Sequence, residues 1–239
     1  MFGLIHRQKN LPYTTDVHSH LIPGIDDGVK SWEESLSILA ELKELGIKKA
    51  ITTPHIISDY YPNSPELIRE KVEVLNAKIK EQNMDLSVEA GAEYFVDDWF
   101  VKQVESGAEL LSFGGKYILV ETGFINKPMY LEEVFFKLKA RGLEPILAHP
   151  ERYDYVQEDI RILERFRDMG VRLQVNASSF TGHYSPLAKK TAEAMVKKGW
   201  VDMIGSDVHH MRHVELLKKA SKTKYFKKLG QLPLLNQTL

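Results

Sequence analysis

The segment DVHSHLIPGIDDG, residues 16–28, places two histidines and three aspartates beside apolar residues near the start of the chain, and it ends in Gly28. It overlaps the run YTTDVHSH, which has the β-branched and apolar residues of a strand, so His18 and His20 come at a strand end. Imidazoles two positions apart suit metal binding, although such a pair also arises by chance. What the segment does therefore depends on what the rest of the chain brings to it.

Short apolar runs alternate with helical patterns along the rest of the chain. Two helix starts are well marked: Ser31 with Glu34 forms a capping box, and Ser64 precedes Pro65 at a first helical position. Strands that alternate with helices predict a parallel sheet, and seven such units favour a closed or nearly closed barrel over an open sheet. The seven strand-like runs are YTTDVHSH, KKAITTPH, LSVEAGAEY, YILVETG, LEPILAHP, VRLQVNAS and VDMIGSDVH.

The composition excludes several functional classes. The 239 residues suit one domain over 1–239, with residues 1–12 as an N-terminal extension. With 32 basic and 33 acidic residues, no global field attracts nucleic acid or an anionic membrane. The absence of cysteine rules out thiolate metal sites and disulfides. No run suits a signal peptide or a membrane span, so a cytoplasmic protein is expected.

Each strand-like run ends in groups that can bind a metal or a phosphate. The carboxyl ends of parallel barrel strands converge on one mouth, so these groups are expected to meet in space. A lone histidine after a strand is usually a loop residue, but the same coincidence at seven strand ends favours a metal cluster. The candidate metal ligands are His18, His20, Asp27, His55, Glu93, Glu121, His149, Asp207 and His209. The sixth run ends at Asn176 and Ser178.

Nine imidazole and carboxylate ligands suit two or three ions of Mn²⁺, Zn²⁺ or Fe²⁺ better than Ca²⁺. Divalent ions ~3.5–4 Å apart suit in-line hydrolysis at phosphorus. The catalytic candidates are Asp207, Arg152 in HPERY and Arg212 after SDVH, and the two arginines would bind phosphate. The other histidines, His6, His183, His210 and His213, are expected in loops or at a helix start.

At this point the motifs DVHSHLIPGIDDGVKSWEES, TPH, GAEYF, HPERY, QVNASS and IGSDVH resemble one family, over nearly the whole chain. This family is the bacterial PHP-type (polymerase and histidinol phosphatase) tyrosine-protein phosphatases of capsular and exopolysaccharide operons. The resemblance implies a distorted (β/α)₇ TIM-like barrel, a trinuclear manganese-dependent centre, and hydrolysis of phosphotyrosine on a bacterial tyrosine kinase. It places the ligands and arginines on the residues named above, chooses Asp27 over Asp26 as a ligand, and assigns Asp16 to orient a ligand imidazole.

Other interpretations stay open. One is a small-molecule phosphatase of the same superfamily, acting for example on histidinol phosphate. A nuclease would need a basic groove, which the balanced charge does not favour. A barrel without metal could serve as a binding module. The lysine-rich stretch 212–228 is either a solvated helix face or a docking surface for an acidic partner.

Overall fold

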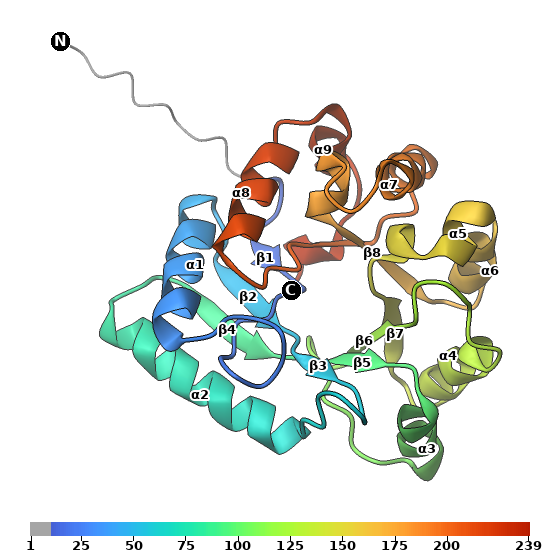
Figure 1. Ribbon diagram of the computed structural model, residues 1–239, viewed down its shortest axis with the longest axis horizontal. Coiled ribbons are helices and arrows are strands. Elements are labelled where there is room, and N and C mark those ends of the chain that lie inside the picture. The colour runs from blue at the N-terminus through green and yellow to red at the C-terminus, as the bar shows by residue number, and fades with distance from the viewer. Residues whose placement is uncertain (1–10) are drawn as a thin grey trace.

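A curled sheet of parallel strands surrounded by helices forms the computed structural model, which describes residues 11–239 (Figure 1). All strand pairs are parallel, in the order β1-β2-β4 and β3-β5-β6-β7-β8-β9. The strands are β1 (Thr15–Asp16), β2 (Lys49–Thr52), β3 (His55–Ile56), β4 (Ser87–Ala90), β5 (Glu93–Phe95), β6 (Tyr117–Glu121), β7 (Glu144–Leu147), β8 (Arg172–Asn176) and β9 (Met203–Gly205). Each predicted run contains at least one strand, but the second and third runs are each split in two.

The helices lie around the outside of the strands (Figure 1). They are α1 (Trp32–Glu44), α2 (Pro65–Glu81), α3 (Asp98–Ser106), α4 (Leu131–Ala140), α5 (Asp154–Glu158), α6 (Ile162–Asp168), α7 (Pro186–Lys198), α8 (Met211–Ala220) and α9 (Lys224–Leu229), with 3₁₀ turns η1 (Pro150–Arg152), η2 (Ala177–Thr181) and η3 (Leu235–Gln237). Ser31 and Ser64 cap α1 and α2 as predicted, each accepting a backbone N–H three residues on. Between residues 11 and 239, no helix is both long and apolar enough to cross a lipid bilayer.

Alternate strand residues face two different apolar clusters. In β6, Ile118 and Val120 pack in the larger cluster, which also contains helix residues, so this face points outward to the helices. Tyr117 and Leu119, between them, belong to a smaller cluster inside the curl. Burial on both faces explains why the strands read as continuous apolar runs. The smaller cluster comprises Val17, Ile51, Phe113, Tyr117, Leu119, Ile146, Ala148 and Met203.

The C-terminal segment joins the first and last strands. Fully buried Asn236 accepts the backbone N–H of Ile204 (2.9 Å) and donates to the carbonyls of Ile204 (2.7 Å) and Thr15 (2.8 Å). Leu235 and Leu239 pack against the smaller cluster, and the C-terminus lies near the centre of the view in Figure 1. One amide side chain thus links β9 to β1.

Replacing Asn236 with alanine should lower the free energy of unfolding by roughly 3 kcal/mol, because buried backbone groups of β1 and β9 lose their partners. Urea unfolding followed by circular dichroism measures the change. Gln237→Ala is the matched control, since Gln237 is exposed and its side chain makes one hydrogen bond within residues 11–239, to the carbonyl of Pro12. Equal stability of the two variants would contradict the bridging role.

The predicted extension, residues 1–12, and His6 lie almost wholly outside the described residues. Of this segment only Leu11 and Pro12 are described. Leu11 is buried, and its backbone N–H donates to the carbonyl of Leu45 after α1 (3.0 Å).

Candidate metal centre

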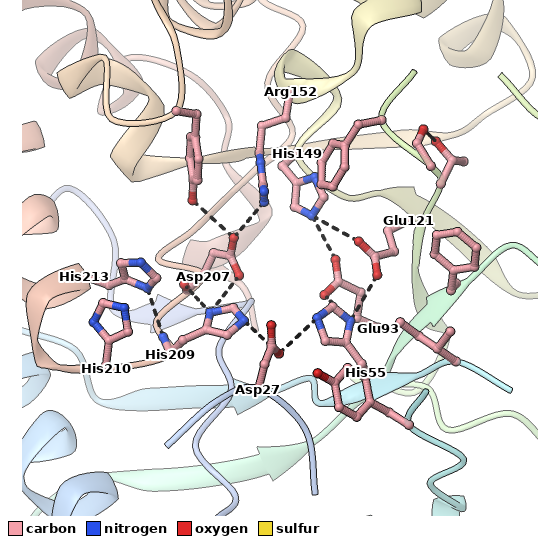
Figure 2. Close-up of a pocket in the computed structure, with 17 residues that line it drawn as sticks. Asp27, His55, Glu93, Glu121, His149, Arg152, Asp207, His209, His210 and His213 are labelled. Carbon is pink, nitrogen blue, oxygen red and sulfur yellow. Dashed lines mark hydrogen bonds and ion pairs between the residues drawn. The ribbon is translucent and has the colours of Figure 1, made fainter. Parts of the chain in front are cut away.

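A cavity with a volume of about 500 Å³ opens where the strands end, and Figure 2 shows the side chains that converge on it. Seven of the nine candidate ligands line it, together with Arg152: Asp27, His55, Glu93, Glu121, His149, Asp207 and His209. The other two, His18 and His20, are fully buried against these residues. The structure therefore brings all nine together from six strand ends and the loop that contains Asp27.

The candidate ligands form four overlapping groups. Within each group, one nitrogen or oxygen atom per residue lies within 4.8 Å of the others. The groups are His20, Asp27, His55 and His209; His18, Glu93 and His149; His18, His20 and Asp207; and His55, Glu93 and Glu121. Among residues 11–239, these groups contain all nine candidates and no other residue. Some residues belong to two groups, as is required of ligands that are shared between neighbouring ions.

Glu93 is at the centre of the cluster. Its Oε2 lies 3.1 Å from His18 Nε2 and 3.3 Å from His55 Nδ1, and its Oε1 lies 3.0 Å from His149 Nε2. Burial alone would raise the pKa of Glu93, but the imidazoles of His18 and His55 hold that pKa well below its usual range. Glu93 is therefore a carboxylate that can face several cations.

Three of the imidazoles are held by a hydrogen bond at Nδ1, with Nε2 toward the centre of the cluster. His18 Nδ1 donates to Gln174 Oε1 (2.8 Å), and His20 Nδ1 donates to Asp26 Oδ2 (2.7 Å). His209 Nδ1 donates to the carbonyl of Asp207 (3.0 Å). Each hydrogen bond fixes the tautomer and leaves the Nε2 lone pair free for a cation.

Several contacts in the cluster fit divalent ions better than a purely hydrogen-bonded core. The Nε2 atoms of His18 and His20 face each other at 3.2 Å. The buried Nδ1 of His55 faces two carboxylate oxygens, Glu121 Oε1 at 3.1 Å and Glu93 Oε2 at 3.3 Å, without the geometry of a hydrogen bond. Burial lowers the pKa of His18, but the charges of Glu93 and Asp207 raise it to about 9. A site that attracts protons to its imidazoles in this way also attracts metal cations.

Asp16 does not orient an imidazole, so that expectation is wrong. Its Oδ1 accepts the backbone N–H of Ser206 (2.8 Å), and its Oδ2 accepts the Ser206 hydroxyl. Gln174 orients His18 instead. Asp16 thus fixes the chain next to Asp207, at the end of β9. Asp26 both orients His20 and accepts the N–H of Gly28 (2.9 Å), which agrees with its expected place beside the ligands.

The backbone around the ligands is tightly fitted. A Cβ on Gly205 would lie 2.5 Å from the Cβ of His18, and a Cβ on Gly28 would lie 2.4 Å from the carbonyl oxygen of His20. His149 and Asp207 have φ of +33° and +52°, a region that non-glycine residues seldom adopt. Such strain is typical of functional sites. The glycines in the motifs DDG and IGSD are therefore required by the candidate ligands His20 and His18, against which they pack.

Arg152 lies at the edge of the cluster, between two aromatic rings. Its guanidinium carbon is 4.7 Å from the ring centre of Phe124 and 4.2 Å from that of Tyr184, and Nη1 donates to Asp207 Oδ2 (3.2 Å). Asn176 Nδ2 donates to the same oxygen (2.6 Å). Burial opposes the charge, but Asp207 raises the pKa of Arg152, so the side chain stays cationic. Its remaining N–H groups can bind an anion in the cavity.

The turn that contains Arg152 is anchored by Glu151. This fully buried side chain accepts hydrogen bonds from the backbone N–H of Asn176 (2.9 Å) and the hydroxyl of Ser179 (2.6 Å). Burial raises the pKa of Glu151 to about 7, although both hydrogen bonds oppose this. Glu151 thus holds η1 against the end of β8.

Some residues differ from the sequence analysis. His210 and His213, expected only at a helix start, line the cavity, and His213 Nδ1 accepts the backbone N–H of His209 (3.1 Å). Sequence reasoning also missed Phe124 and Tyr184, of which Phe124 follows a strand end and Tyr184 carries no such signal. Arg212 is exposed in the first turn of α8 and is not among the residues that line the cavity, so its phosphate-binding role stays a prediction.

Comparison with known proteins gives a consistent result. Residues 14–232 match the family described as capsular polysaccharide synthesis, CpsB/CapC. Tyrosine-protein phosphatase YwqE of Bacillus subtilis is 30% identical over 198 residues, 82% of this chain and 78% of the relative. Tyrosine-protein phosphatase CpsB of Streptococcus pneumoniae is 28% identical over 202 residues, 82% of this chain and 83% of the relative. A structure from work on YwqE and CpsB, described as metal-dependent tyrosine phosphatases, is similar with a TM-score of 0.79, 27% identity, and coverage of 94% of this chain and 96% of the other.

Proposed function

The chain belongs to the CpsB/CapC family of capsular polysaccharide synthesis, and on this premise we propose that it is a metal-dependent protein-tyrosine phosphatase. The observation that carries the proposal is the cluster of nine histidine and carboxylate side chains at the cavity, with the partly buried Arg152 beside it. Such a cavity offers cations and a guanidinium to a dianionic phosphate. A binding module without metal would not need this donor set.

The finer description of the fold is part of the proposal. We assign residues 1–239 to one domain, a distorted (β/α)₇ barrel of the PHP type, with residues 1–12 as an extension. Counting β2 with β3, and β4 with β5, as interrupted single strands gives seven. A parallel bridge between Ser19, beyond β1, and Val208, beyond β9, links the first predicted run to the last and supports closure of the ring.

We assign the metal ligands to the nine residues of the cluster. Divalent ions held there would supply positive charge for the phosphoryl oxygens and lower the pKa of an attacking water. Arg152 would bind the phosphoryl group through the N–H groups that do not contact Asp207. Phe124 and Tyr184 hold its guanidinium in place from both sides. The tyrosine leaving group has a pKa of ~10, so it needs less protonation than a serine alkoxide would.

The metal and the partner are also proposals. We propose two or three Mn²⁺ ions, with Zn²⁺ or Fe²⁺ as alternatives for the same nitrogen and oxygen donors. The proposed substrate is a phosphotyrosine of a bacterial tyrosine kinase that controls capsular or exopolysaccharide synthesis, in line with the family description. A cytoplasmic location is part of this proposal, because the kinase would make phosphotyrosine from ATP there.

Chelation should reduce hydrolysis of phosphotyrosine by at least about a thousandfold, because both charge neutralisation and water activation would be lost. Adding Mn²⁺ to the chelated protein should restore the rate. Phosphate release is measured with phosphotyrosine, phosphoserine and histidinol phosphate, and metal content is measured by mass spectrometry. Full activity in protein shown to contain no metal would contradict the proposal, and faster hydrolysis of histidinol phosphate would favour the small-molecule alternative.

A further inference from the structure

A second cleft adjoins the cavity of the metal centre. Its volume is about 310 Å³, and Phe124, Arg152 and Tyr184 line both this cleft and the larger cavity. Its other lining residues are Asp154, Gln157, Ser185 and Ala188. We call it the flanking cleft. Because these three residues line both spaces, a ligand bound beside Arg152 lies at the border of the flanking cleft.

The polar groups of the flanking cleft are mainly acceptors. The carboxylate of Asp154 is exposed and makes no hydrogen bond or ion pair with any residue from 11 to 239. Gln157 donates through Nε2 to the carbonyl of Glu151 (2.9 Å), so its Oε1 remains as an acceptor. Arg152, which is placed to bind phosphate, is therefore followed two positions later by Asp154, whose carboxylate has no partner among residues 11–239.

We propose that the flanking cleft binds the residue next to phosphotyrosine in the substrate, and that Asp154 selects a lysine or arginine side chain there. The inference rests on the proposed phosphatase function and adds a preference about sequence. Phosphate bound at Arg152 would bring the neighbouring residue to the cleft, where a cationic side chain can pair with Asp154. The same carboxylate would repel a glutamate or aspartate at that position.

The test uses phosphotyrosine peptides that differ in one residue, lysine, glutamine or glutamate, placed immediately before or after the phosphotyrosine. The Mn²⁺-loaded protein and its Asp154→Asn and Asp154→Lys variants are compared by kcat/KM, divided by the value of the same variant for free phosphotyrosine. Glu158→Lys is the matched control, because Glu158 lies on the same helix, is exposed, and lines neither cavity.

At one of the two positions, the wild-type protein should prefer lysine over glutamate by roughly fivefold, as for one exposed ion pair and its reversal. Asp154→Asn should bring the ratio close to one, Asp154→Lys should reverse it, and Glu158→Lys should leave it as in the wild type. No preference at either position, a preference for glutamate, or a ratio unchanged by Asp154→Lys would overturn the inference. Failure of the wild-type protein to hydrolyse free phosphotyrosine would instead reject the proposed function.

Discussion

Replacing Glu93 with glutamine should remove both the metal and the activity, with kcat/KM for phosphotyrosine lower by about a thousandfold or more. The side chain keeps its size but loses its charge, and an amide NH₂ replaces one of the oxygens. The two oxygens face His18, His55 and His149 at 3.0–3.3 Å. Among the four carboxylates of the cluster, Glu93 is the one that occurs in two groups, and Glu121 shares only one of them. No other carboxylate of the cluster therefore faces the same three imidazoles.

Metal content by mass spectrometry and steady-state kinetics measure the two losses together. Glu89→Gln is the control, because Glu89 lies on β4 in the same predicted run but pairs with Lys49 (2.6 Å), away from the cluster. It should keep its metal and its rate. A Glu93→Gln protein that is folded by circular dichroism, fully loaded and active would show that the cluster does not hold the catalytic ions.

The convergence of the candidate ligands could be predicted from sequence, because the carboxyl ends of parallel barrel strands lie at one mouth. A polar residue just after a buried strand must emerge at the carboxyl edge, whatever the exact length of the strand. The prediction therefore survived the interruption of the second run at Thr53 and Pro54 and of the third at Gly91 and Ala92. The position of each strand end decided which side chains meet at the mouth, and an error in strand length did not change that prediction.

The residues that support the ligands could be read only in part. Gln174 had a signal, because it is a polar residue between the buried Leu173 and Val175 of β8 and so points into the curl. Asp16 had none, because its partner Ser206 is 190 residues away and a carboxylate at a strand end suits many partners. Helix α3 also has a sequence signal, since Asp97 caps its first turn and Gly107 ends it.

Replacing Arg152 with lysine should leave the metal content unchanged and lower kcat/KM for phosphotyrosine by about a hundredfold. Lysine keeps the positive charge. It cannot contact Asp207 and a phosphoryl oxygen with a planar fork, and it does not stack between Phe124 and Tyr184 as guanidinium does. Because these contacts position the group for the transition state, kcat should fall as well as KM rise, and inorganic phosphate should inhibit less strongly.

Two further arginine variants make this result specific. Arg161→Lys is the neutral control, because Arg161 is exposed and pairs only with Asp159 among the described residues. Arg212→Ala tests the second predicted phosphate ligand: a loss comparable to that of Arg152→Lys would support its role, and an unchanged rate would leave phosphate binding to Arg152. If Arg152→Lys instead lost its metal, the effect would come through Asp207, since Arg152 and Asn176 both donate to the same oxygen of that candidate ligand. Equal kcat/KM in Arg152→Lys and Arg161→Lys would show that the guanidinium between the two rings does not touch the reacting phosphate.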